Sequence, residues 1–582
     1  MTHKSPIFFA TLFLCLVAVK AQDSTSVTTV PKRIYTTKTI GEQPPPVIDG
    51  ILDDESWNLV EWQGDFVEWR PDENTPPSHQ TKFKILYDKK NLYVGIRAYD
   101  DEPDKIVKRL SRRDGFDGDW IEINFDSYHD LRTGFSFNVT AAGVKGDEFI
   151  SDNGNDWDGS WNPIWYTKTN IDEEGWTAEM KIPFSQLRFG KAKEQIWGLQ
   201  LNRRFFRAEE RSLWQRVPQD APGWISEMGE LHGLIDLEPQ KQLEIQPFTV
   251  TQLETYPEEE GNPFRGGNDF GLNGGIDAKI GVTNDLTLDL TINPDFGQVE
   301  ADPAAIALDG FQIFFREQRP FFIENKNIFD YRIDNNSADN IFYSRRIGRS
   351  PQGYPDTEDN EFVDKPQNTT ILGAAKFSGK TKSGWSIGIL ESVTTKEYAE
   401  IDNNGSRRKE LVEPLTNYFV GRLQKDFNER NTFIGGIFTA TNRPGHLPEQ
   451  LDFLHTSAYT GGLDFTHQWK DRTFYTSGNL VLSHVRGSEE AIEATQNSLT
   501  HLFQRVDAGH VAVDPNRTSL TGTGGRVEIG KAGSGHWRYS AGLVWRSPEL
   551  ELNDIGFLRQ ADQITQYANI RRLWNKPTSW FR

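Results

Sequence analysis

The sequence has one cysteine, Cys15, and few methionines, three among 582 residues. Beyond residue 19 no stretch is apolar for long enough to form a transmembrane helix, which needs about 20 residues. If the segment with Cys15 is removed on export, the remaining chain has no thiol for a disulfide, a cysteine nucleophile or a thiolate metal site. Without a transmembrane helix, any insertion into a membrane must be by a closed β-barrel, the other fold that satisfies all of its own backbone hydrogen bonds in lipid.

The amino terminus is typical of an export signal. His3 and Lys4 precede an apolar run from Ile7 to Val19, and the side chains at Val19 and Ala21 are small or short. The run is too short to cross a bilayer as a helix. We therefore expect residues 1–21 to be a signal peptide.

The charge balance bears on partners. The chain has 64 basic and 84 acidic residues, a net charge of −20. Such a surface repels a phosphate backbone, so we expect no nucleic-acid partner. An acidic surface suits cations and neutral polyols instead.

The residue pattern after the expected signal peptide predicts a linker followed by a first domain. Residues 22–46 are rich in Ser, Thr, Val and Lys and end in three prolines, which predicts a linker. Residues 47–237 contain short alternating runs broken by Gly, Asp and Pro, as in 82–98 and 120–125. This spacing predicts an antiparallel, jelly-roll-like β-sandwich.

From residue 238 to 582 the alternating runs become longer. Successive side chains of a strand point to opposite faces, so one face is apolar and the other polar. The clearest run sets Leu286, Leu288, Leu290 and Ile292 against Thr287, Asp289, Thr291 and Asn293. Strands of roughly ten residues, with tight turns on one side and long loops such as 354–369 and 487–517 on the other, predict an outer-membrane-type barrel in contact with lipid. A soluble all-β domain is the alternative, and the small strand count favours a fragment of a larger barrel.

The first domain resembles the family 9 carbohydrate-binding modules. The resemblance rests on Ile48-Asp49-Gly50, Asp53, Trp57, Leu92-Tyr93-Val94, Asp119-Trp120-Ile121-Glu122-Ile123 and Trp176-Thr177-Ala178-Glu179-Met180-Lys181-Ile182-Pro183. It implies a β-sandwich that binds sugar ends between aromatic side chains and carries calcium.

The residues themselves suggest where a glycan would bind. Sugars stack their C–H faces on indole rings and need charged or amide partners for their hydroxyls. The densest group of such side chains lies in residues 152–165, so we predict carbohydrate contacts from Trp157, Trp161 and Trp165. Asn202 and Arg203, on an expected strand, are further candidates for such contacts. The alternative is that these tryptophans pack an edge of the sandwich. For calcium, which prefers several oxygens, the candidate ligands are Asp117, Asp119, Asp152, Asp156 and Asp158, although a solvated acidic turn would look the same.

A second resemblance covers Asn293-Pro294-Asp295-Phe296-Gly297-Gln298-Val299-Glu300-Ala301-Asp302 and Phe314-Phe315-Arg316-Glu317-Gln318-Arg319-Pro320-Phe321-Phe322-Ile323-Glu324-Asn325. The chain is similar there to an uncharacterised Gram-negative family that joins a family 9-like module to an outer-membrane-type barrel. We expect residues 294–350 to form a plug or constriction. Its charges at Arg316, Glu317, Arg319 and Glu324 either form structural salt bridges or filter solutes by charge.

Catalytic patterns are scarce. There is no His-Glu-x-x-His helix and no phosphate-binding Gly-rich loop, and Gly384-Trp385-Ser386-Ile387-Gly388 spells a nucleophile elbow only within an alternating strand. The sequence therefore favours a non-catalytic outer-membrane protein that binds a glycan for capture or uptake, with the sandwich in the periplasm. A glycoside hydrolase and a structural envelope protein without a sugar site are the alternatives.

Overall fold

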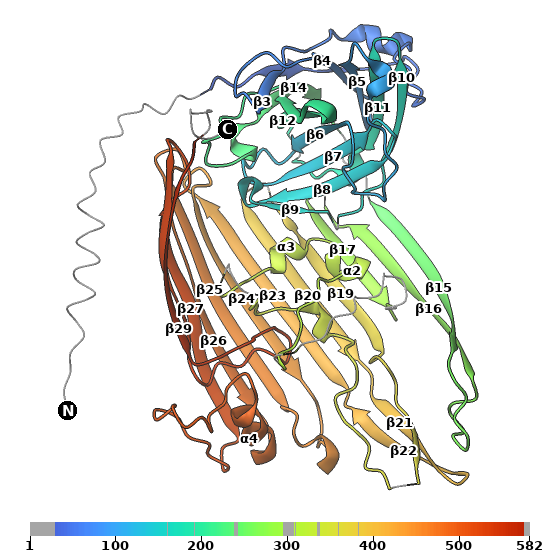
Figure 1. Ribbon diagram of the computed structural model, residues 1–582, viewed down its shortest axis with the longest axis vertical. Coiled ribbons are helices and arrows are strands. Elements are labelled where there is room, and N and C mark those ends of the chain that lie inside the picture. Colours follow the sequence, from blue (N-terminus) through green and yellow to red (C-terminus); the bar gives the residue numbers. More distant parts are fainter. Residues whose placement is uncertain are drawn as a thin grey trace, which may run out of the picture.

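The computed structural model describes residues 30–574 except 160, 191, 238–241, 284, 295–307, 309, 335–337, 359 and 382. A β-sandwich lies over one end of a large, curved antiparallel sheet (Figure 1). This confirms the predicted all-β order of a sandwich followed by a membrane-type sheet. The predicted signal peptide lies outside the described residues.

The sandwich consists of two sheets. The larger sheet contains β1 (Ile34–Thr36), β14 (Gly229–Ile235), β12 (Glu194–Phe205), β6 (Trp120–Asp126), β7 (Gly134–Thr140), β8 (Lys145–Ser151) and β9 (Asp156–Asp158), with β13 (Glu210–Leu213) and β3 (Val67–Arg70) at one side. The smaller sheet contains β10 (Tyr166–Asp172), β11 (Gly175–Pro183), β5 (Asn91–Tyr99), β4 (Thr81–Tyr87) and β2 (Lys38–Thr39). The inward side chains of both sheets, among them Ile96, Ile123, Phe137 and Trp176, form one buried core.

The sandwich begins earlier than the sequence predicted. Residues 34–39 were expected in a linker, but β1 pairs in parallel with β14, and β2 pairs in parallel with β4. Tyr35 is buried between the sheets, and its hydroxyl accepts a hydrogen bond of 2.8 Å from the backbone of Ile85. These strands are too short to show a period, so their pairing depends on contacts with distant residues.

The motif residues of the first resemblance lock a loop onto the smaller sheet. The buried carboxylate of Glu179 on β11 accepts hydrogen bonds from the backbone amides of Asp49 (3.1 Å) and Gly50 (2.9 Å). It also accepts one from the indole Nε1 of Trp57 at 3.1 Å. Gly50 has a φ of +92°, and a Cβ there would lie 2.9 Å from a backbone carbon of Thr169. The motif is therefore a structural clamp.

Twelve strands form the second sheet, and each neighbouring pair is antiparallel. In order they are β15 (Leu243–Thr255), β16 (Asn268–Gly281), β17 (Leu286–Ile292), β19 (Ile371–Lys380), β20 (Trp385–Thr394), β23 (Thr416–Phe427), β24 (Thr432–Asn442), β25 (Ser457–Trp469), β26 (Phe474–Arg486), β27 (Ser519–Lys531), β28 (Trp537–Arg546) and β29 (Gln563–Arg572). Within the described ranges β15 and β29 do not pair with each other, so this barrel-like sheet is open along one side.

The two faces of this sheet differ in polarity, as the alternation predicts. On the convex face Leu463 is 64% exposed and Ile434 is 53% exposed, with Val527 similarly uncovered. On the concave face Arg422 and Thr439 are buried. The sheet is therefore apolar outside, whereas its inner face mixes polar side chains with apolar ones such as Ile437. No helix in the described parts of the chain is long and apolar enough to cross a membrane.

The connections differ between the two ends of the sheet. Tight turns such as 428–431 and 470–473 lie at the end that faces the sandwich, and the long connections lie at the other end (Figure 1). The long connections carry β18 (Phe362–Asp364), the hairpin of β21 (Glu397–Asn403) and β22 (Ser406–Glu413), and α4 (Glu489–Asn497). Short 3-10 turns cover Glu55–Leu59, Pro103–Lys105, Asp152–Gly154, Phe184–Gln186, Phe206–Ala208, Ile225–Glu227, Ser344–Arg346 and Glu449–Leu451.

The predicted plug segment lies on the concave side of the sheet, where it contains α2 (Pro320–Ile323) and α3 (Lys326–Phe329) (Figure 1). Phe329 and Tyr331 pack in one apolar cluster with Tyr418 and Ile437 of the sheet. Most of its first part, residues 295–307, lies outside the described residues.

The four predicted lumen charges lie in or beside this plug. Arg319 pairs with Glu317 at 2.7 Å. Glu324 pairs with Lys279 of β16 and with Arg188 of the sandwich. Arg316 is exposed to solvent.

Candidate functional site

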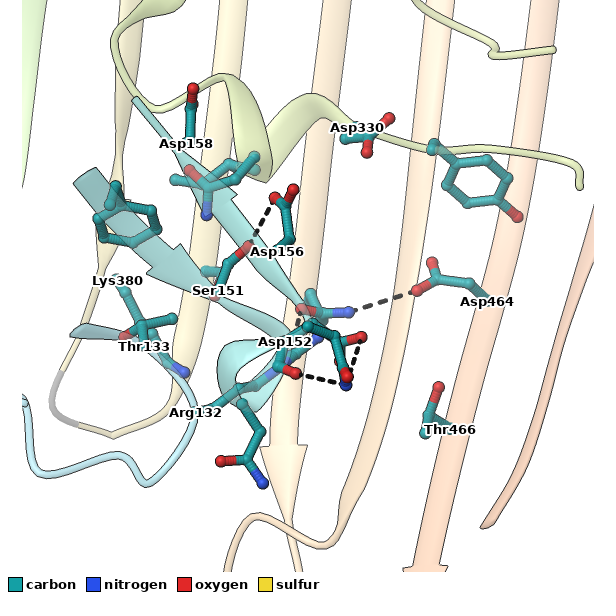
Figure 2. Close-up of a pocket in the computed structure, with 18 of the residues that line it drawn as sticks. Arg132, Thr133, Ser151, Asp152, Asp156, Asp158, Asp330, Lys380, Asp464 and Thr466 are labelled. Atoms are coloured by element: carbon teal, nitrogen blue, oxygen red, sulfur yellow. Dashed lines mark hydrogen bonds between the residues drawn. The ribbon is translucent and has the colours of Figure 1, made fainter. Parts of the chain in front are cut away.

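A cavity of about 720 Å³ lies between the sandwich and the concave face of the sheet. Figure 2 shows its lining from three directions. Arg132, Ser151, Asp152 and Asp156 come from the sandwich, Asp464 and Thr466 come from β25, and Asp330 follows α3. The cavity therefore exists only where the two domains meet.

The loop predicted to bind sugar forms the sandwich side of this cavity. Asn153 takes a left-handed φ of +58°, which asparagine tolerates better than most residues. Its carbonyl accepts a hydrogen bond of 2.7 Å from the backbone of Trp224, and its Oδ1 accepts one of 2.9 Å from Ser226. Asp152 and Asp156 line the cavity beside it. Loss of solvation there raises the pKa of Asp152, while Arg132 opposes the rise.

The three predicted tryptophans have different surroundings. Trp161 is half-buried, lines the cavity and packs against Phe135 with ring centroids 5.0 Å apart. Trp157 is half-buried against Trp224. Trp165 is 1% exposed, and its Nε1 donates to Asp147 at 2.9 Å inside the sandwich core. The prediction for Trp165 is wrong in this structure, because its ring has no free face for a sugar.

Asn202 and Arg203 are neighbours on β12 and point to opposite faces of it. The Arg203 guanidinium enters the core and donates to the carbonyls of Tyr99 (2.8 Å) and Gln80 (3.2 Å). It joins the two sheets and is buried, so the prediction of a sugar contact from Arg203 is wrong here. Asn202 points to the other face, where its Nδ2 donates to Glu122 at 2.9 Å.

The five carboxylates predicted for calcium are not gathered. Asp117 pairs with Arg109, and Asp158 pairs with Lys326 at 2.8 Å. Asp119 is buried and accepts a hydrogen bond from the backbone of Val107. In the described part of the chain no three His, Cys, Asp or Glu side chains lie close enough to hold a metal ion. The residues as placed do not fit a calcium site, and a role for calcium stays a prediction.

The outer side of the larger sandwich sheet carries two rows of polar side chains, of which only Asn202 was predicted from the sequence. Asn202, Glu122 and Asn138 lie side by side in register across β12, β6 and β7. Asn124, Ser136 and Glu148 form the next row. Five of these six side chains are buried beneath their neighbours, and Glu148 is half-buried. We call these two rows the polar face. Buried Oδ1 of Asn138 has no hydrogen-bond partner among the described residues, so the face has unused bonding capacity.

Aromatic rings border the polar face. The guanidinium of Arg211 on β13 lies 5.0 Å from the ring centroid of Trp69 and 5.2 Å from that of Trp120. All three side chains are half-buried. Burial lowers the pKa of Arg211, and the nearby Glu122 opposes this effect. Burial and the neighbouring carboxylates of Glu122 and Asp114 raise the pKa of Glu148 to about 7.

Trp224 covers one side of the polar face and also contacts Asn153, which lines the cavity. Trp224 donates from its Nε1 to Oδ1 of Asn124 at 2.9 Å, and its backbone amide binds Asn153. A signal for the face was present in the sequence. In residues 119–126 the polar side chains alternate with Ile121, Ile123 and Phe125, which predicts one polar face on β6.

Two family models match different parts of the chain. Residues 48–204 match the family model described as carbohydrate family 9 binding domain-like. A comparison with curated proteins gave no match. Similar solved structures include a family 9 carbohydrate-binding module from Caldicellulosiruptor kristjanssonii in complex with glucose, at 21% identity over 36% of this chain and 100% of that one, with a TM-score of 0.27. They also include the outer membrane channel DcaP of Acinetobacter baumannii, at 6% identity over 78% of this chain and 95% of that one, with a TM-score of 0.25.

The second family model covers the curved sheet and the plug. Residues 239–582 match the model described as domain of unknown function DUF5916, which is more than half of the chain. The protein therefore belongs to the DUF5916 family and has a carbohydrate family 9 binding domain-like sandwich before the family's own region.

Proposed function

We propose that this protein binds carbohydrate through the polar face of its sandwich and is anchored in an outer membrane, where it captures a glycan for uptake. The observation that carries the proposal is the pairing of two polar rows with Trp69 and Trp120 in a domain that matches a sugar-binding family model.

The chemistry of the polar face suits a sugar. A sugar hydroxyl both donates and accepts hydrogen bonds, so its site needs both kinds of partner. The half-buried Glu148 offers acceptor oxygens, and Arg211 offers donors between two indole rings. Indole faces provide the apolar surface on which the C–H groups of a sugar ring stack.

Support for the membrane comes from the convex face of the sheet. Large apolar side chains such as Leu463, Ile434 and Leu482 are about half exposed or more on neighbouring strands. A contiguous apolar surface of this kind on a folded protein marks a contact with lipid or another protein. Apolar-out and polar-in alternation is the pattern of transmembrane barrels.

The orientation follows from the turns. Outer-membrane barrels have short turns on the periplasmic side and long loops outside. Since the sandwich lies at the end with the short turns, we place it in the periplasm, where it would hold a glycan after passage through the barrel.

Titration calorimetry of the detergent-solubilised full chain with glucose and cellotriose tests the sugar site. We expect Trp69→Ala and Trp120→Ala each to weaken binding by about tenfold, because an aromatic contact contributes about 1 kcal/mol or more beyond its buried area. Trp62→Ala is the control, since Trp62 is an exposed tryptophan near Lys84, outside the polar face. Equal affinity in all four proteins would contradict the proposal. Release of reducing sugar in the same samples would favour the hydrolase alternative.

A further inference from the structure

We propose that the cavity between the sandwich and the sheet is a second carbohydrate site, which takes a neutral oligosaccharide and is separate from the polar face. The inference rests on the proposed function, because it gives the same class of ligand a second place to bind. The cavity volume of about 720 Å³ lies within the range of small-molecule sites, about 300–1,000 Å³.

The charges that line the cavity balance. Seven basic and seven acidic side chains line it among the described residues, although the chain as a whole has a net charge of −20. A site that selects an anion or a cation would show an excess of the opposite charge. Balanced charges with many donors and acceptors suit a neutral polyol instead.

Most of these charges hold one another in place. Arg422 pairs with Asp464 at 2.5 Å across neighbouring parts of the wall. Lys326 of α3 pairs with Asp158 of the sandwich, and Arg188 pairs with Glu324. The last two pairs join the sandwich to the plug, and Glu324 also pairs with Lys279 of the sheet at 3.1 Å. The walls of the cavity are therefore held in place before a ligand arrives.

Arg526 on β27 is different. Its side chain is 8% exposed and lines the cavity, yet Nε and Nη1 have no hydrogen-bond partner in the described chain. Asn479 lies directly opposite it in register on β26, and its buried Oδ1 is also without a partner there. Two guanidinium donors of Arg526 and the amide oxygen of Asn479 are thus both available to a ligand on neighbouring strands. Leaving such groups unsatisfied costs free energy, which a ligand with vicinal hydroxyls would recover.

The sandwich side offers the complementary groups. Asp152 and Asp156 present carboxylate oxygens to the cavity (Figure 2). Trp161 adds a half-buried indole ring from the same loop. A sugar in the cavity would therefore meet donors from the sheet and acceptors and an aromatic ring from the sandwich.

A cysteine reporter tests the site. In a Cys15→Ser background, Thr466→Cys and, separately, Ser477→Cys place a thiol at the cavity wall of the full chain. We measure its reaction rate with an uncharged methanethiosulfonate. At a concentration of about ten times its Kd, cellotriose or xylotriose should slow the reaction about tenfold. Arg526→Gln should raise the sugar concentration needed for protection by about tenfold or more. Arg571→Gln, an exposed arginine on β29, is the matched control.

The outcomes separate the two proposals. Protection that survives Trp69→Ala supports a second site. If calorimetry detects the Trp69-dependent site but neither trisaccharide protects either reporter, this inference fails and the proposed function stands. Protection that Trp69→Ala abolishes, or that trigalacturonate gives at lower concentration than the neutral sugars, also overturns it. If neither site binds, both proposals fail.

Discussion

Lys380 of β19 and Asp130 of the sandwich form an ion pair of 2.7 Å in which the carboxylate is buried. The same ammonium group lies 2.8 Å from Asp426 of β23. Burial opposes ionisation of Asp130, but Lys380 outweighs it and holds the pKa of this carboxyl below its usual range. One lysine of the sheet thus binds a carboxylate in each domain.

Replacing that lysine should loosen the docking of the sandwich. Lys380→Met leaves two buried carboxylates without their cation, and removing one partner of a buried pair costs about 3–5 kcal/mol. We expect faster hydrogen exchange in residues 126–133, measured by mass spectrometry. Lys409→Met is the control, because Lys409 is exposed and its ion pair with Glu400 is long, at 3.9 Å. Unchanged exchange in Lys380→Met would show that the ion pair does not hold the domains together.

The clamp at Glu179 predicts a loss of stability. Glu179→Ala leaves the amides of Asp49 and Gly50 and the indole of Trp57 without their acceptor, which should cost at least about 3 kcal/mol. Chemical denaturation of the full chain, followed by tryptophan fluorescence, measures the change. Glu173→Ala alters an exposed glutamate on the neighbouring turn and should leave the midpoint unchanged. A small effect in Glu179→Ala would contradict the clamp.

The raised pKa of Glu148 predicts a pH dependence. Its pKa is about 7 in the folded protein and about 4.5 when unfolded, so the folded state binds more protons between these values. The contribution of Glu148 to the free energy of unfolding is therefore largest below pH 4.5 and decreases as the pH rises to about 7. Glu148→Gln removes that fall, so the Tm of the variant relative to wild type should increase from pH 4.5 to 7 and then level off. Glu194→Gln, at an exposed position on β12, serves for comparison. A constant difference would refute the pKa assignment.

The membrane assignment predicts an asymmetry between the two faces of β25. Leu463→Arg places a charge near the middle of the strand on the convex face, where arginine costs about 2–4 kcal/mol in a bilayer. We expect less protein in the outer-membrane fraction and loss of the heat-modifiable band. Gln468→Arg places the same charge on the cavity side and should be tolerated. Equal yields of both variants in the soluble periplasm would rule out the anchoring.

The sequence predicts what alternation alone determines. In β17 the leucines point outward while Thr287 and Asp289 are buried on the concave side, as the two-residue period requires. The same pattern excludes a shift of the register by one residue, which would turn every side chain to the other face. For this reason the fold class and the polarity of both sheet faces could be predicted.

The sites depend on distant contacts that no local pattern records. Trp165 and Trp161 are four residues apart, yet one is in the core and the other lines the cavity. Trp69 and Arg211 belong to strands far apart in the sequence, which pair only in the folded sandwich. Lys380 and Asp130 are likewise separated by 250 residues. Type and spacing of residues could suggest sugar-binding chemistry, but not which tryptophan would keep a free ring.

Trp224 links the polar face to the cavity, since it binds Asn124 through its indole and Asn153 through its backbone. A ligand that shifts this residue at one location changes the affinity at the other if the second ligand binds the two positions of Trp224 differently, and thermodynamic reciprocity then makes the two changes equal. Binding at the polar face and binding in the cavity would then be cooperative or competitive rather than independent.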